Sequence, residues 1–159
     1  MHEFSTLDIV RIFNIPRERL REWLNRGFIR PSVQGAKGQG TKAIFNRDDL
    51  YIIAMFRDLI ENGLSRLSAS ACAHQIKRKD LSAISYVVFT YIRYRNRVVI
   101  NARTGKSYKE KRDAVTATVR FVKNQAELKK VFGSKAPWDS ILIVNLEKLK
   151  KEVDTIIGR

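Results

Sequence analysis

The spacing of apolar residues changes near residue 80, and this change most constrains the fold. Up to about Lys77, apolar residues recur at the three- and four-residue spacing of amphipathic helices. Three later runs are rich in Val, Ile, Thr and aromatic residues, as β-strands are: ISYVVFTYI (84–92), RVVINA (97–102) and AVTATVRFV (114–122). We therefore predict an α+β protein with a four-helix domain at residues 1–79 and a small antiparallel-sheet α+β domain at residues 84–159.

Capping residues and helix breakers delimit the helices of the first domain. The predicted helices span residues 5–14, 16–26, about 47–62 and about 65–77. Pro16 stands near the first turn of the second helix, Gly27 ends it, and Asn46 caps the third helix. The first two helices, joined by the tight turn FNIP, are a helix-turn-helix candidate. Residues 28–45 look like two short extended pieces around a glycine-rich tip.

The second domain closes with a helix, a strand and a helix. These elements are predicted at residues 124–132, 141–145 and 146–158. The last helix carries an apolar stripe of Leu146, Leu149, Val153, Ile156 and Ile157. This spacing favours packing on the domain's own sheet over the pairing of two chains.

The net charge points to a polyanionic partner. The chain has 159 residues, with 31 Lys and Arg against 16 Asp and Glu, for a formal charge of +15. Such an excess opposes compaction through self-repulsion, so nucleic acid and an anionic membrane are the two candidate partners. The apolar runs are too short to span a bilayer, and the start does not read as a signal peptide. We expect a cytoplasmic protein with no membrane partner, in which the lone Cys72 is buried.

The segment PRERLREWLNRGFIRP (16–31) contains five arginines around a small apolar set. At helical spacing, Arg17, Arg21 and Asn25 line one flank of the second helix. An ion-paired surface helix and a helix lying against phosphate are both compatible with this composition. The ion pairs expected in the first case join Glu22 with Arg26 and Arg19, and Glu18 with Arg21. They leave Arg17 and Arg30 unpaired.

The stretch FSTLDIVRIFNIPRERLREWLNRGFIRPS resembles the N-terminal winged helix-turn-helix of MerR-type regulators and the related small excisionases. The matching pieces, in order, are Phe4-Ser5, Ile15-Pro16, Leu20-Arg21-Glu22-Trp23 and Gly27-Phe28-Ile29-Arg30-Pro31. Downstream, IFNRDDL (44–50) and IENGLSRLSASA (60–71) resemble the start of the family's next helix and the junction after it. The resemblance covers roughly residues 4–77.

The resemblance implies a sequence-specific double-stranded DNA-binding protein of bacteria or phage that regulates transcription. It places Arg21 against DNA, and puts Arg17 and Arg19 in the same helix, which would enter the major groove. Residues 32–43 would form a wing, with Arg30, Lys37 and Lys42 as further DNA contacts. The family usually has arginine where this chain has Ala43, so Lys42 would substitute for it.

The resemblance ends after Lys77. MerR regulators dimerise through a long helix that this sequence lacks. The residues therefore do not decide whether the protein forms a homodimer. An excisionase-like or DNA-bending recombination accessory factor is the alternative function that the same headpiece supports. A third alternative is a regulator whose second domain docks a protein or a small-molecule effector.

The second domain adds its own basic segment. Arg93, Arg95 and Arg97 would share one strand face if the chain stays extended, and neighbouring tyrosines could stack on bases. An edge hairpin protected from aggregation by its charge is the competing interpretation. Two histidines and one cysteine provide neither a zinc site nor a recognisable nucleophile with its base. We therefore expect no enzyme, metal or cofactor.

Overall fold

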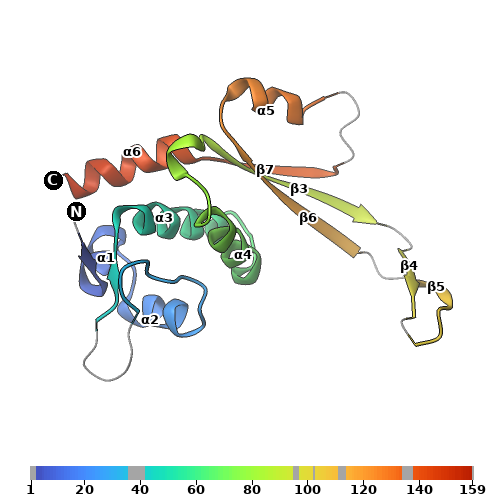
Figure 1. The fold of residues 1–159 in the computed structure, drawn as a ribbon, viewed down its shortest axis with the longest axis horizontal. Coiled ribbons are helices and arrows are strands. Elements are labelled where there is room, and N and C mark those ends of the chain that lie inside the picture. Colours follow the sequence, from blue (N-terminus) through green and yellow to red (C-terminus); the bar gives the residue numbers. More distant parts are fainter. Residues whose placement is uncertain are drawn as a thin grey trace. The chain divides into compact units, whose positions relative to one another are not determined.

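The computed structural model describes residues 3–35, 42–94, 97–101, 103–110, 114–133 and 138–158. Over this part of the chain the protein is α+β (Figure 1). Its helices are α1 (Thr6–Phe13), α2 (Arg17–Asn25), α3 (Arg47–Glu61), α4 (Arg66–Ile76), α5 (Gln125–Val131) and α6 (Leu146–Ile157), with a 3-10 turn, η1, at Leu81–Ala83. Its strands are β1 (Phe4–Ser5), β2 (Ile44–Phe45), β3 (Tyr86–Tyr94), β4 (Arg97–Ile100), β5 (Ser107–Glu110), β6 (Ala114–Val122) and β7 (Ser140–Asn145). The predicted helices are confirmed with small shifts at their ends.

The chain divides into two compact units. Unit 1 comprises Met1–Ser85 and Val144–Arg159, and unit 2 comprises Tyr86–Ile143. This division differs from the expected second domain of 84–159, because the C-terminal helix α6 belongs to unit 1. There α6 packs along α3, where Asp154 accepts hydrogen bonds from Tyr51 Oη at 2.6 Å and Arg47 Nε at 2.9 Å. Helix α6 therefore packs on a helix rather than on the sheet expected from its spacing.

The turn between α1 and α2 is fixed by backbone and side-chain bonds. Ser5 and Asp8 form a capping box at the start of α1, and the hydrogen bonds from Ser5 lower the pKa of Asp8. Asn14 ends α1 in the left-handed conformation, with φ 47°. Arg57 of α3 donates to the Phe13 carbonyl at 2.8 Å, so α3 holds the end of α1 in place.

The core of unit 1 lies between α2, α3 and α4. Leu20 and Trp23 of α2 are buried, and the Trp23 ring meets Phe56 of α3 edge-on, with centroids 5.0 Å apart. Cys72 of α4 is buried, as expected, and burial raises the pKa of its thiol to about 12. The two faces of α2 are thus sharply different, since its apolar side closes this core.

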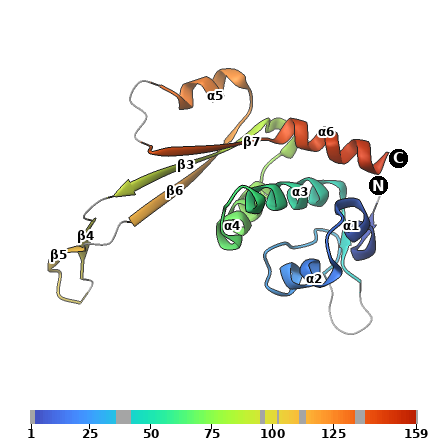
Figure 2. The ribbon, with the colours of Figure 1, turned by 180° about the vertical axis from the view of Figure 1, so that it is seen from behind.

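Unit 2 is built on a three-stranded sheet in the order β6-β3-β7. β3 and β6 pair antiparallel along nine residues each, from Tyr86↔Val122 to Tyr94↔Ala114. Val131 of α5 packs on Val88 and Val122 of the sheet. β4 and β5 form a separate antiparallel ribbon that extends beyond the ends of β3 and β6, as Figure 2 shows from behind. The sequence predicts every strand of unit 2 except β5.

No described helix of the protein is long and apolar enough to cross a membrane.

Candidate nucleic-acid interface

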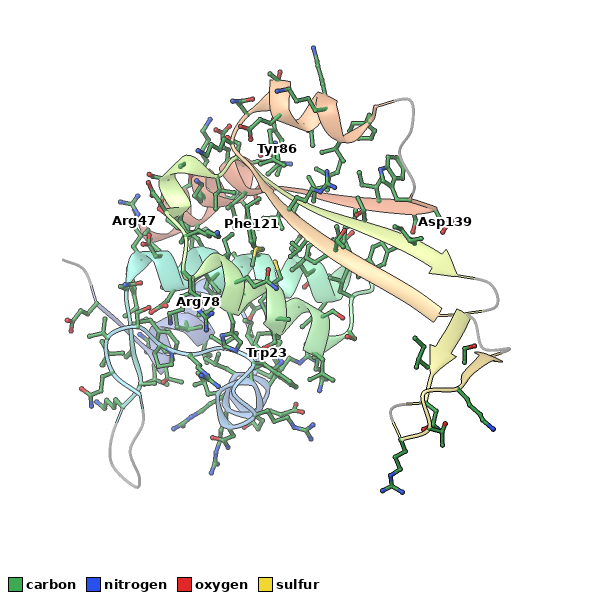
Figure 3. All side chains as sticks on the ribbon, turned by 45° about the vertical axis from the view of Figure 1, so that its right-hand side comes forward. Trp23, Arg47, Arg78, Tyr86, Phe121 and Asp139 are labelled. Carbon is green, nitrogen blue, oxygen red and sulfur yellow. The ribbon has the colours of Figure 1, made fainter. Side chains whose placement is uncertain are left out.

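The outer face of α2 presents arginines because its inner face is committed to the core. Leu20 and Trp23 are 0% and 4% exposed, whereas Arg17, Arg19 and Arg21 are all exposed. Figure 3 shows Trp23 between α2 and the neighbouring helices, while other side chains of α2 project outward. The arrangement leaves three guanidinium groups on one short helix available to an anionic ligand.

The described acidic side chains pair with Arg26 and Arg66 but not with the three exposed arginines of α2. Glu22 lies 3.3 Å from Arg26 Nε and 3.0 Å from Nη1 of Arg66, a residue of α4. The expected pair of Glu22 with Arg26 is confirmed, but the expected pair with Arg19 is wrong: the second partner of Glu22 is Arg66, and both guanidinium groups contact the same oxygen, Glu22 Oε1. No ion pair joins Glu18 to Arg21 within the described residues. Among these residues, four arginines of the segment have no acidic partner: Arg17, Arg19, Arg21 and Arg30.

A hollow of about 320 Å³ lies along one flank of α2. It is lined by Ser5, Thr6, Leu7, Arg17, Arg21, Leu24, Asn25, Lys42 and Ala43. Arg17, Arg21 and Asn25 thus share the flank predicted from helical spacing, and Lys42 joins them from the segment before β2. Thr6 was missed by sequence reasoning, because only the packing of α1 beside α2 places it there. The hollow combines three positive charges with neutral hydrogen-bonding groups, a composition suited to a phosphate oxygen.

Two side chains of α4, together with Lys77 just after it, hold the backbone that leaves α2. His74 Nε2 lies 2.9 Å from the Gly27 carbonyl, and Ser70 Oγ donates to the Phe28 carbonyl at 3.0 Å. Lys77 Nζ donates to the Arg30 carbonyl. Gly27 itself has a φ of 68°, a left-handed conformation that favours glycine. The direction in which the chain leaves α2 is therefore set by α4.

Asp49 of α3 anchors the end of this segment. Its side chain is 1% exposed and accepts hydrogen bonds from Ser32 N at 2.7 Å and Ser32 Oγ at 2.6 Å. It also accepts from Asn46 N at 3.1 Å in a capping box, and Lys77 Nζ lies 3.2 Å away. Sequence reasoning placed Asp49 only in the first turn of a helix, although the Asn46 to Asp49 spacing signals a capping box. A buried carboxylate with this many donors fixes its surroundings tightly.

The base of the expected glycine-rich hairpin is present. Gln34 and Ile44 form an antiparallel bridge, and β2 then pairs with β1 through Phe4↔Phe45. Ala43 is buried beside the hollow. Lys37, in the predicted tip, lies outside the described residues.

The basic segment of unit 2 is divided between two sheets. Arg93 lies on β3 opposite Val115, and Arg97 lies on β4 opposite Glu110. The expectation of one strand face shared by Arg93, Arg95 and Arg97 is therefore not met, and Arg95 itself lies outside the described residues.

In the part of the chain that the structure describes, no cluster of three His, Cys, Asp or Glu side chains could hold a metal ion.

Comparison with known families agrees with this geometry. A family model described as MerR HTH family regulatory protein matches residues 4–67. The match runs from β1 to the first residues of α4, so it contains α1, α2, the segment clamped by α4, and α3. It covers less than half of the chain and none of unit 2, and no curated protein matches the chain. Residues 4–67 are therefore a helix-turn-helix DNA-binding domain of the MerR type, a family of regulatory proteins.

Proposed function

We propose that this protein binds double-stranded DNA at specific sequences and regulates transcription through that binding. The observation that carries the proposal is the exposed face of α2, where Arg17, Arg19 and Arg21 have no acidic partner among the described residues. Neighbouring Arg26 and Arg66 share Glu22 instead. Exposed guanidinium groups on a short helix backed by a rigid core suit entry into a major groove.

In this proposal the three arginines have different roles in recognising the DNA sequence and in positioning α2 on the duplex. Arg21 lies one helical turn after Arg17, and both line the hollow with Lys42. In our proposal Arg21 contacts a base edge, where arginine can bond guanine with two hydrogen bonds. Arg17 and Lys42 hold the adjacent phosphate, and Arg19 contacts the backbone from the other flank. Such phosphate contacts fix the register of α2 on the duplex but carry no sequence information.

We also propose that residues 32–43 form a wing that contacts DNA beside α2. The antiparallel bridge at Gln34 and Ile44 supports this, because it holds the two sides of the segment together at its base. The hydrogen bonds from α4 and Lys77 to the carbonyls of Gly27, Phe28 and Arg30 further support it, because they fix the start of the segment. Lys37 and Lys42 would supply its positive charge, and Arg30 would contact the flanking phosphate.

A second candidate function is that of a recombination accessory factor resembling the small excisionases. The observation that favours it concerns α6, the last helix. It has 12 residues, about 18 Å of helix, and packs on α3. Among the described residues, no helix has the length of the dimerisation helix that MerR regulators use. A factor that fills neighbouring sites as single copies would need no such helix, whereas a homodimeric regulator would need another interface.

Selection of binding sites from random-sequence DNA tests the proposal. We expect one enriched motif, bound about 10³–10⁷ times more tightly than unrelated DNA at physiological salt. Light scattering of the complex on the selected site gives the number of copies bound. One dimer on a symmetric site favours a regulator, and several monomers on repeated sites favour the accessory factor. Absence of any enriched motif, with equal affinity for all duplexes, would contradict sequence-specific binding.

A further inference from the structure

The β4–β5 ribbon of unit 2 is a protruding basic element that the MerR-type domain does not explain. β4 and β5 pair through four residues each, from Arg97↔Glu110 to Ile100↔Ser107. The ribbon extends beyond the three-stranded sheet as an arm (Figures 1 and 2). Residues 97–112 contain six Lys and Arg and a single acidic residue. A protruding basic hairpin of this kind matches the charge of a nucleic-acid backbone.

Hydrogen bonds join the described residues of the turn between β4 and β5. Asn101 N donates to the Lys106 carbonyl at 3.0 Å, and Gly105 N donates to the Asn101 carbonyl at 2.8 Å. The Asn101 side-chain oxygen accepts from Arg103 N at 2.9 Å and Thr104 N at 3.3 Å. Gly105 has a φ of 64°, which glycine adopts without strain.

The charge around the tip favours an anionic partner. Unit 2, residues 86–143, has thirteen Lys and Arg against four Asp and Glu, a net charge of +9. Arg103 and Lys106 at the tip are exposed, and no described acidic side chain forms an ion pair with either of them. Lysine is depleted from protein–protein interfaces, whereas paired cations beside an accessible backbone are typical of phosphate contacts.

An exposed apolar side chain lies at this basic tip. Ile100 is 69% exposed at the last pair of the ladder, opposite Ser107. It is the right size for a wedge between two base pairs. Proteins that kink DNA insert such residues from the minor groove while nearby cations hold the phosphates.

We propose that the β4–β5 ribbon is a DNA-bending arm whose tip inserts Ile100 between base pairs from the minor groove. Arg103 and Lys106 hold the phosphates on either side of the opened step. The inference rests on the proposed function only in taking DNA as the partner of this chain. Sequence is read by α2, and the arm deforms the duplex without reading it.

The test uses the full chain and a short duplex that carries a dye at each end and 2-aminopurine at successive positions. Binding of the unaltered protein is expected to bring the dyes closer, consistent with a kink of about 20–90°. It should also raise 2-aminopurine fluorescence at one step, because that base loses its stacking. Ile100→Ala should abolish both signals while changing the dissociation constant by only about threefold, since phosphate contacts dominate affinity. Ile100→Phe should retain them, because a ring can also act as a wedge.

Ile156→Ala is the matched control, because Ile156 of α6 is also an exposed isoleucine, 44% exposed, and lies outside the ribbon. It should leave both signals unchanged. Arg103→Ala and Lys106→Ala should each reduce the slope of log affinity against log salt by about 0.9. Full bending and unstacking by Ile100→Ala would overturn the proposal. A protein that selects a sequence but bends DNA equally with and without Ile100 retains the proposed function and refutes the arm. A protein that bends DNA through Ile100 but selects no sequence supports the arm and refutes the proposed function.

Discussion

Removal of the buried Asp49 carboxylate should strongly destabilise unit 1. Asp49→Ala leaves the amides of Ser32 and Asn46 without their acceptor and Lys77 without its counter-ion. Each unsatisfied buried donor costs about 1–3 kcal/mol. Partial relaxation makes these terms less than additive, so we expect a loss of about 3–5 kcal/mol, the range for breaking a buried ion pair. This is a large share of the roughly 5–15 kcal/mol that stabilises a typical domain.

Urea unfolding monitored by the fluorescence of Trp23 measures this loss in unit 1 alone. Trp23 lies in α2 against Phe56, and Trp138→Phe removes the chain's second tryptophan, which is in unit 2. The free energy of unfolding should fall with little change in the slope against urea, because the surface exposed on unfolding is nearly the same. Asp49→Asn should lie between the two proteins, because it retains a hydrogen-bond acceptor but loses the charge.

Asp48→Ala is the matched control for Asp49→Ala. Asp48 precedes Asp49 in the first turn of α3, but it is exposed. Its removal loses only a favourable interaction with the helix dipole, worth about 0.3–1 kcal/mol. Equal destabilisation by the two substitutions would refute the reasoning, since it would mean that burial and the bonds to Ser32 contribute nothing beyond helix capping.

Two further predictions concern titratable groups of unit 1. Burial first, and then the hydrogen bond to Asp154, raise the pKa of Tyr51 to about 12 from an ordinary value near 10. The protonated phenol thus stabilises the folded state below pH 10, and this stabilisation should disappear as the pH rises from about 10 to about 12. Tyr51→Phe should flatten the pH dependence of the unfolding free energy in that window, and an unchanged curve would contradict the assignment. Because burial raises the pKa of Cys72 to about 12, its thiol should react with a disulfide reagent at pH 8 only after denaturant is added; rapid reaction of the folded protein would contradict its burial.

The helices were predictable because their signals are local. Asn46 caps α3 with its own side chain, and Gly27 and Gly63 follow α2 and α3 in left-handed conformations. The turn residues and apolar spacing around these positions lie within a few residues of one another. These local signals can therefore be interpreted without knowledge of the tertiary structure.

The missed features depend on residues far apart in the sequence. Glu22 and Arg66 are 44 positions apart, so helical spacing alone favoured Arg19 as the partner. β5 reads SYKE, a polar sequence that becomes a strand only because β4 pairs with it. The stripe of α6 fits a sheet or a helix equally well, and the bonds of Asp154 to α3 distinguish the two only in the folded structure.

The most direct test of the central claim compares Arg21→Ala with Arg26→Ala on the selected DNA site and on unrelated DNA. Both arginines are exposed in or next to α2, but Arg26 pairs with Glu22 and Arg21 has no acidic partner among the described residues. Fluorescence anisotropy gives the ratio of the two dissociation constants for each protein. Arg21→Ala should lower this ratio by the equivalent of about 1–3 kcal/mol, roughly 5- to 150-fold, while Arg26→Ala leaves it within about twofold. An unchanged ratio for Arg21→Ala, or an equal fall for both variants, would contradict sequence reading by the free arginines of α2.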